Sequence, residues 1–96
     1  MENCKGREFE AQKEYQDLTF VLFKDKWCSL CRDVEYVLKE IIGLNIPVYA
    51  IDVSKNTDLL EKYSIKEIPT VVVFKKGRIA GFIEGKHSKN KYLSFT

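Results

Sequence analysis

The chain has 96 residues, of which 45% are hydrophobic and 31% are charged, and its formal net charge is +2. This length fits a single domain, residues 1–96, that buries roughly 60–70% of the surface exposed by its unfolded chain. The 16 basic and 14 acidic side chains nearly cancel and are scattered, so we expect no nucleic-acid partner. Residues 1–17 lack the apolar stretch of a signal peptide, and no run reaches membrane-spanning length. We therefore expect a cytoplasmic, reducing location and no membrane partner.

The first half of the chain predicts helix, strand, helix and strand in that order. Residues 6–16 are weakly amphipathic and indicate a short helix. The apolar run Leu18–Phe23 is rich in β-formers, which is typical of a central strand covered on both faces. From Cys28 to Ile42 apolar residues recur on one helical face, with Gly43 as the expected C-cap. A second strand is expected over Ile46–Val53, where Pro47 is tolerable near the start.

The second half predicts a short helix, a hairpin and a closing helix. The helix is expected over Asn56–Tyr63, and the strands over Thr70–Phe74 and Arg78–Glu84, antiparallel to each other. Gly81 indicates a bulge in the returning strand, and Ser88 is the expected N-cap of the last helix. This order predicts an α/β fold, a mixed central β-sheet flanked by helices. Functional sites of such sheets lie at the ends of strands.

The most informative motif is Trp27-Cys28-Ser29-Leu30-Cys31, where the first predicted strand has ended and a helix begins. Two cysteines three residues apart on a first helical turn point the same way and can close a disulfide. The amide groups and dipole of the helix start favour a thiolate on Cys28. The motif therefore predicts redox chemistry.

Two other uses of the cysteines are weighed against this one. A structural disulfide across two residues constrains little of the unfolded chain, so it is a poor brace. Zinc needs four ligands, and the remaining candidates, Cys4 and His87, do not form a second paired motif, so we expect no metal. Cys4 is interpreted as a bystander, and His87 is assigned no chemistry.

Several landmarks in order resemble the thioredoxin family, from about Leu18 to Ser88. They are the apolar strand, the Cys28/Cys31 motif, the segment Tyr63–Thr70 with its Ile68-Pro69 step, Phe74-Lys75-Lys76-Gly77, and Gly85 before the last helix. The resemblance implies the thioredoxin fold and a cis Ile68–Pro69 bond. It also implies that an extended client segment binds beside the dithiol. The binding residues it implies are Trp27, Ile68, Pro69, Thr70 and Gly85.

The resemblance further implies a protein disulfide oxidoreductase. Cys28 is then the nucleophile that forms a mixed disulfide with the client, and Cys31 is the resolving thiol. The redox-active disulfide is the only cofactor expected. The expected partners are disulfide-containing client proteins and a thioredoxin-reductase-like electron donor, and the protein is expected to act as a monomeric reductant. The alternatives are a glutaredoxin-like, glutathione-dependent reductase and a protein-binding module whose cysteines are vestigial or metal-linked.

The sequence departs from the family at positions that tune the chemistry. Ser29 and Leu30 replace the usual Gly-Pro, which changes the redox poise in a direction we leave open. Leu22 and Ala50 replace the family's buried acid and its lysine partner, so both members of a charged pair are absent. An apolar neighbour leaves Cys31 harder to ionise, which predicts a slower resolving step. Tyr36 replaces the helix-kinking proline, which predicts a straighter helix.

Charged residues surround the motif. Lys24 and Lys26 add positive potential that favours the Cys28 thiolate, and Asp25 opposes it, so their net effect is expected to be small. The remaining charges are expected to face solvent and to shape client choice. They are Arg32, Asp33, Lys66, Glu67 and Lys86.

Overall fold

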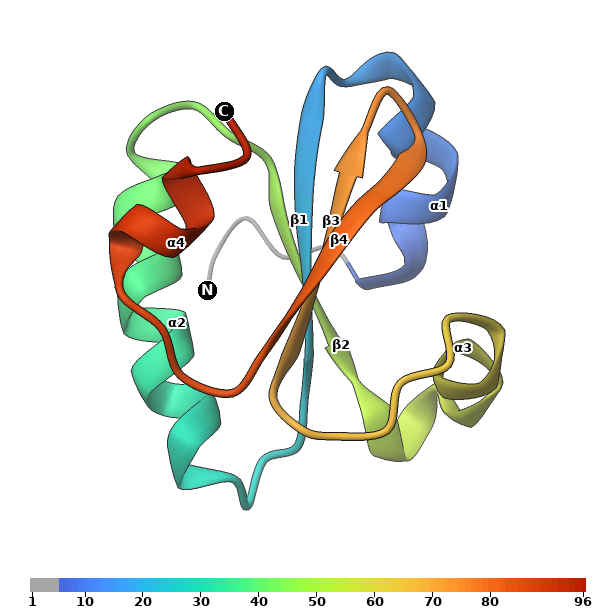
Figure 1. The fold of residues 1–96 in the computed structure, drawn as a ribbon. Coiled ribbons are helices and arrows are strands. Elements are labelled where there is room, and N and C mark those ends of the chain that lie inside the picture. The colour runs from blue at the N-terminus through green and yellow to red at the C-terminus, as the bar shows by residue number, and fades with distance from the viewer. Residues whose placement is uncertain (1–5) are drawn as a thin grey trace.

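The computed structural model describes residues 6–96, in which a four-stranded sheet lies between two layers of helices (Figure 1). Cys4 lies outside the described residues, so its interpretation as a bystander stays a prediction. Within residues 6–96, no helix combines the length and the apolar character needed to cross a bilayer.

The sheet has the strand order β2-β1-β3-β4. Strand β1 (Leu18–Lys24) is parallel to β2 (Val48–Asp52) and antiparallel to β3 (Thr70–Lys75), which in turn pairs antiparallel with β4 (Arg78–Glu84). The mixed sheet and the central place of β1 are confirmed. The chain reaches from the end of β1 to the parallel strand β2 through α2 (Ser29–Ile42). This crossover leaves the carboxyl end of β1 free to carry a site.

The second strand is shorter than predicted. It begins at Val48 instead of Ile46, and the carbonyl of Pro47 accepts a hydrogen bond from the Phe20 N–H at 3.0 Å. Proline has no N–H to donate to the ladder, so regular pairing starts one residue later. At the other end, the Asp52 side chain accepts from the Ser54 N–H at 3.0 Å and turns the chain into the 3₁₀ turn η3 (Val53–Lys55).

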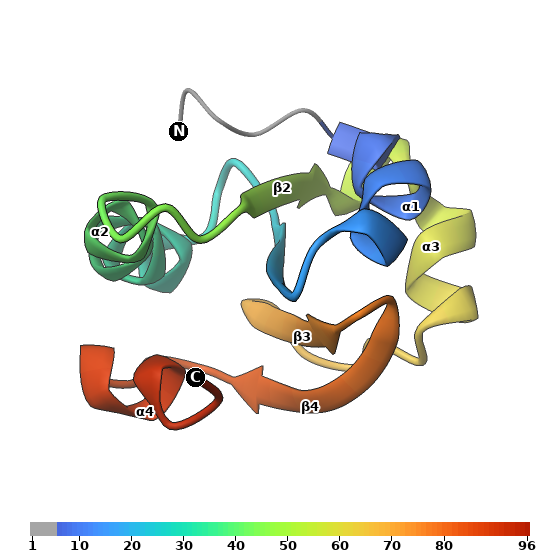
Figure 2. The same ribbon diagram turned by 90° about the horizontal axis from the view of Figure 1, so that it is seen from above.

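Helices cover both faces of the sheet (Figure 2). One face carries α2 and α4 (Lys89–Leu93), and the other carries α1 (Phe9–Gln12) and α3 (Thr57–Lys62). The predicted helix over residues 6–16 is only partly regular, because α1 is a single turn between the 3₁₀ turns η1 (Gly6–Glu8) and η2 (Lys13–Tyr15). Gly43 is the C-cap of α2 and Ser88 the N-cap of α4, as predicted, although Ser88 makes no capping hydrogen bond through its side chain.

The alternating side chains of β1 build two separate cores. Phe20 and Leu22 point to the α2 side, and Val21 and Phe23 point to the α1 side. All four are fully buried. Strand β1, which precedes the dithiol, is thus packed against a core on each of its two faces.

The bulge predicted at Gly81 is confirmed. Val73 pairs with Gly81 and Phe74 with Ile79, so one residue of β4 is left over between these pairs. A Cβ atom at position 81 would lie 2.8 Å from the ring of Phe95, which follows α4. Glycine therefore allows the end of the chain to pack against the sheet.

Glu10 joins the first helical segment to α3. Its carboxylate accepts hydrogen bonds from the Tyr63 hydroxyl, at 2.9 Å, and from the Lys62 ammonium, and it lies 3.8 Å from Arg7. Burial alone raises the pKa of Glu10, but the hydrogen bonds from Lys62 and Tyr63 and the nearby positive charges outweigh it and hold that pKa below its ordinary value. A carboxyl whose pKa is lower in the folded state stabilises the fold above its unfolded pKa, and this stabilisation is lost as the pH falls through the folded value.

Glu10→Gln should therefore lower the free energy of unfolding at pH 7 by about 1–2 kcal/mol. The difference from the wild type should shrink as the pH falls through the lowered folded pKa of Glu10, because the wild-type carboxyl then becomes neutral like the glutamine amide. Urea unfolding at pH 7 and pH 3 measures both quantities. The matched control is Glu8→Gln, at an exposed position two residues away. A destabilisation that is equal at both pH values would contradict the charged role of Glu10.

Candidate functional site

The dithiol lies at the connection between the end of β1 and the start of α2, at the lower end of the molecule in Figure 1. Cys28 has extended backbone angles and is the N-cap of α2, and its Sγ accepts a hydrogen bond from the Cys31 N–H at 3.2 Å. The Cys28 N–H donates to the carbonyl of Asp25 at 3.1 Å, which fixes the turn between strand and helix. An N-cap atom that accepts from a helical amide is placed to hold negative charge.

The two thiols differ in access to solvent. Cys28 is partly exposed, whereas Cys31 is 1% exposed, and both are free thiols. Burial, together with the hydrogen bond to Cys28, raises the pKa of Cys31 to about 12, and the negative charge of Glu35 acts in the same direction. A hydrogen bond from the Asp25 backbone lowers the pKa of Cys31, but it offsets only part of this rise. Cys31 is therefore a protonated, shielded thiol at neutral pH.

The strand register brings a second segment to the same end of the sheet. Phe23 pairs with Thr70 and Thr70 pairs with Glu84, so Pro69 and Gly85 both lie beside the end of β1. The Ile68–Pro69 bond is cis, as the resemblance implied, and the Gly85 N–H donates to the carbonyl of Pro69 at 2.9 Å. Gly85 has a φ of +75°, a conformation that glycine adopts without strain.

An ion pair joins this second segment to the helix of the dithiol. Lys86 Nζ lies 3.6 Å from the carboxylate of Asp33 on the first turn of α2. Three segments, residues 24–33, 67–70 and 84–86, thus meet at one end of the sheet, and we call this end the dithiol edge. The sequence placed its site residues in these same three segments.

Two of the predicted binding residues contribute less side chain than expected. Thr70 is 2% exposed, and its hydroxyl donates to the carbonyl of Glu67 at 2.6 Å, so it shapes the loop from within. Ile68 is half-buried and packs against the core on the α3 side.

Trp27 and Leu30 are the apolar groups exposed beside the dithiol. They are 85% and 47% exposed, and Lys26 Nζ lies 5.2 Å from the centre of the Trp27 indole. The backbone N–H of Trp27 donates to Asp25 Oδ1 at 3.3 Å. A shallow hollow of about 160 Å³ opens there, and its lining residues are Lys26, Trp27, Cys28, Ser29 and Arg32.

Comparison with known proteins agrees with this geometry. The family model for thioredoxin matches residues 1–96. The chain belongs to the thioredoxin family. A thioredoxin from Rickettsia bellii is 30% identical over 97 residues, which cover 97% of this chain and 92% of the relative. A thioredoxin Y of Oryza sativa, described as chloroplastic, is 31% identical over 87 residues, covering 88% of this chain and 52% of the relative.

The solved structures confirm the thioredoxin fold. A mutant thioredoxin from Halobacterium salinarum superposes with a TM-score of 0.86 at 22% identity, covering 96% of this chain and 82% of the other. Thioredoxins reduce disulfide substrates, are reduced by thioredoxin reductase, and work through a redox-active disulfide without an external cofactor. The protein is a thiol–disulfide oxidoreductase, and the glutaredoxin-like and binding-module alternatives are not favoured.

The departures from the family are visible in the core. Leu22 is fully buried on the α2 side and lies opposite the partly buried Ala50 in the parallel pair β1–β2, so the two positions where the resemblance implies an acid and a lysine carry no charge. Helix α2 runs from Ser29 to Ile42 without interruption, and Tyr36 is 74% exposed on it. The slower resolving step stays a prediction, and the raised pKa of Cys31 has the direction that it requires.

The structure adds one contact that the sequence reading missed. Lys24, which we expected to add positive potential near Cys28, donates instead to Glu35 Oε1 at 2.8 Å. Its charge is therefore offset by a carboxylate on α2. The spacing of Glu35, one helical turn after Cys31, was a signal available in the sequence.

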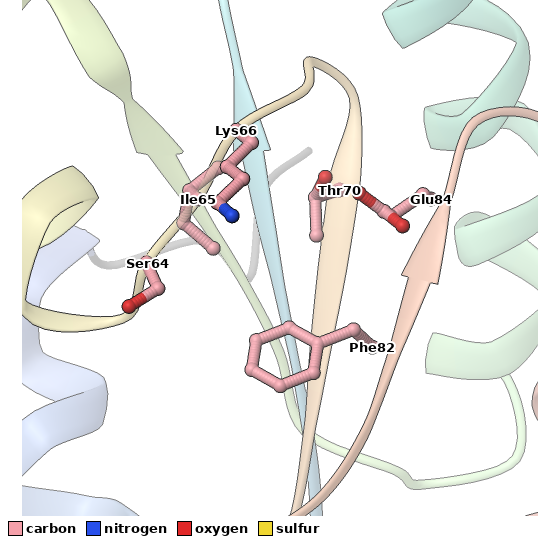
Figure 3. A pocket seen from close by; sticks show the side chains of 6 residues that line it. All are labelled: Ser64, Ile65, Lys66, Thr70, Phe82 and Glu84. Carbon is pink, nitrogen blue, oxygen red and sulfur yellow. The ribbon is translucent and has the colours of Figure 1, made fainter.

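A pocket beside the Pro69 loop was also missed (Figure 3). It has a volume of about 280 Å³ and lies between the loop after α3 and strand β4. Phe82 lies on the outer strand β4, where its backbone pairs with Val72 of β3. Its side chain is 46% exposed and forms an apolar wall of the pocket. The lining residues are Ser64, Ile65, Lys66, Thr70, Phe82 and Glu84.

Among the described residues, no three His, Cys, Asp or Glu side chains are grouped so that they could hold a metal ion. His87 is exposed, and its ring Nε2 lies 2.9 Å from the carbonyl of Glu84. It is therefore engaged with the end of β4.

Proposed function

We propose that Cys28 is the nucleophile of this oxidoreductase and that Cys31 is the resolving thiol. The observation that carries the proposal is the difference between the two sulfurs: Cys28 is accessible and accepts a helix N–H, whereas Cys31 is buried. The Cys28 thiolate attacks one sulfur of a client disulfide, and the other client sulfur leaves as a thiolate. Cys31, once deprotonated, attacks Cys28 Sγ and releases the second client thiolate. Two electrons pass to the client, and a Cys28–Cys31 disulfide remains.

The dithiol edge supports a binding site for an extended client segment. The exposed Trp27 supplies an apolar contact. The backbone N–H and C=O of Ile68 are the groups that pair with a strand-like peptide, because Pro69 has no N–H and its carbonyl already accepts from Gly85. Gly85, which is held to Pro69, has no side chain that could block the approach. Thr70 keeps the loop in shape through its bond to Glu67. Ser29 and Leu30 lie between the cysteines and tune the stability of the thiolate.

We further propose that the chain acts as one domain and as a monomeric reductant in the cytoplasm, with a thioredoxin-reductase-like donor. A dithiol that serves as a reductant needs a compartment whose donors return it to the thiol form. Equilibration with glutathione buffers tests the direction of electron flow. A midpoint potential below about −240 mV, within the cytosolic glutathione poise, supports a reductant, and one well above it supports an oxidant.

Insulin reduction tests the activity and its electron donor. The full chain should catalyse precipitation of reduced insulin chains with dithiothreitol, and it should also turn over with NADPH and a bacterial thioredoxin reductase. Glutathione with glutathione reductase is the comparison, because a glutaredoxin-like enzyme would prefer it. Failure with every donor would refute the proposed function.

A further inference from the structure

The ion pair between Lys24 and Glu35 lies next to the buried thiol of the dithiol. Lys24 is the last residue of β1, and Glu35 is one helical turn beyond Cys31, so the Cβ atoms of Cys31 and Glu35 are roughly 5–6 Å apart. The two charged groups are 2.8 Å apart and only 31% and 21% exposed. A partly buried carboxylate held in place by a strand residue is unusual on a helix surface, where long charged side chains are normally solvated.

The resolving step creates a need that this carboxylate can meet. Cys31 must lose its proton before it can attack Cys28, and its pKa is raised to about 12 by burial and by the hydrogen bond to Cys28. The buried residue opposite Ala50 is Leu22, whose apolar side chain cannot accept this proton. Glu35 is the carboxylate whose charge acts on the Cys31 thiol.

We infer that Glu35, positioned by Lys24, accepts the proton of Cys31 during resolution of the mixed disulfide. The inference rests on the proposed roles of Cys28 and Cys31. In the step, the Cys31 S–H bond breaks and its proton passes through a water molecule to the Glu35 carboxylate. The Cys31 sulfur bonds to Cys28 Sγ, the bond between Cys28 and the client breaks, and the client sulfur leaves with the electron pair. Glu35 then returns its proton to the solvent or to the departing thiolate.

Charged residues on the elements around this site enter its pH dependence. Lys24 faces Glu35 from β1, and the turn before the dithiol contributes Asp25 and Lys26. The neighbouring turns of α2 contribute Arg32 and Lys39. Lys86, from the segment after β4, is paired with Asp33.

A stopped-flow reaction with 5,5′-dithiobis(2-nitrobenzoate) separates the two steps. Attack by Cys28 releases the first thionitrobenzoate, and resolution by Cys31 releases the second. Glu35→Gln should leave the first release unchanged and slow the second by about tenfold or more at pH 7. The second rate should then rise with pH more steeply than in the wild type, and added imidazole should restore part of it. Glu40→Gln, an exposed carboxylate of the same helix, is the matched control.

The opposite result has a clear physical meaning. If Glu35 acts only through its charge, its removal lowers the pKa of Cys31 and speeds the second release. An unchanged or faster second release therefore overturns the inference. Lys24→Gln/Glu35→Gln leaves no unpaired charge and repeats the test if the single variant unfolds. Absence of the first release in the wild type would refute the proposed roles of the cysteines, a different failure from that of Glu35.

Discussion

Cys28→Ser is expected to lower insulin reduction by at least about 1,000-fold, because a serine hydroxyl cannot replace the thiolate that attacks the client disulfide. The remaining thiol does not take over. Cys31 is 1% exposed and its pKa is raised to about 12, so it is shielded from the client and mostly protonated near pH 7. The insulin assay measures the loss, and iodoacetamide labelling followed by mass spectrometry shows whether Cys31 becomes reactive.

The structural cost of this change should be small. Serine is a good N-cap residue, so its hydroxyl keeps a bond to the Cys31 N–H in the place of the sulfur. An unchanged melting temperature would attribute the lost activity to chemistry. If Cys28→Ser retained substantial insulin reduction, another sulfur would have to start the reaction, and the assignment of Cys28 would be wrong.

The elements best predicted from sequence were those fixed by local patterns. Strand β1 and helix α2 follow from an almost wholly apolar run and from a regular helical face. The switch between them placed Cys28 at the helix start, although the helix begins one residue later than predicted, at Ser29, with Cys28 as its N-cap. The bulge at Gly81 was marked by a glycine inside a strand. In each case the information lies within a few residues.

The features that were missed depend on contacts between distant parts of the chain. The single turn of α1 is held through Glu10 by Tyr63 at the end of α3. The inward hydrogen bond from the Thr70 hydroxyl to the carbonyl of Glu67 could likewise not be predicted, and the role of Thr70 in client binding stays a prediction.

The Lys24–Glu35 pair shows the same limit at the site itself. Each residue was visible in the sequence as a charge near the cysteines, and Lys24 was read as a source of positive potential. Only the placement of β1 beside α2 shows that the charge of the lysine is offset by a carboxylate on α2, one helical turn beyond Cys31. The motif thus predicted where the dithiol lies, while the contacts around it required the fold.

Cys31→Ser is expected to convert the protein from a catalyst into a trap. Cys28 keeps its exposure, and its Sγ keeps the hydrogen bond from the backbone N–H of residue 31, so the first attack on a client disulfide should proceed at the wild-type rate. The second step has no thiol left, because serine cannot attack the mixed disulfide. The covalent complex should then accumulate until an external thiol cleaves it.

Mass spectrometry after non-reducing gel separation should identify the client joined through Cys28, and dithiothreitol should release it. The Cys28→Ser/Cys31→Ser variant is the control, since it has no dithiol sulfur with which to form the bond. The two single variants therefore have opposite expected outcomes, no complex for Cys28→Ser and a persistent complex for Cys31→Ser. A client trapped by Cys28→Ser, through Cys31, would mean that the buried sulfur is reached first, and the order of the two steps would have to be reversed.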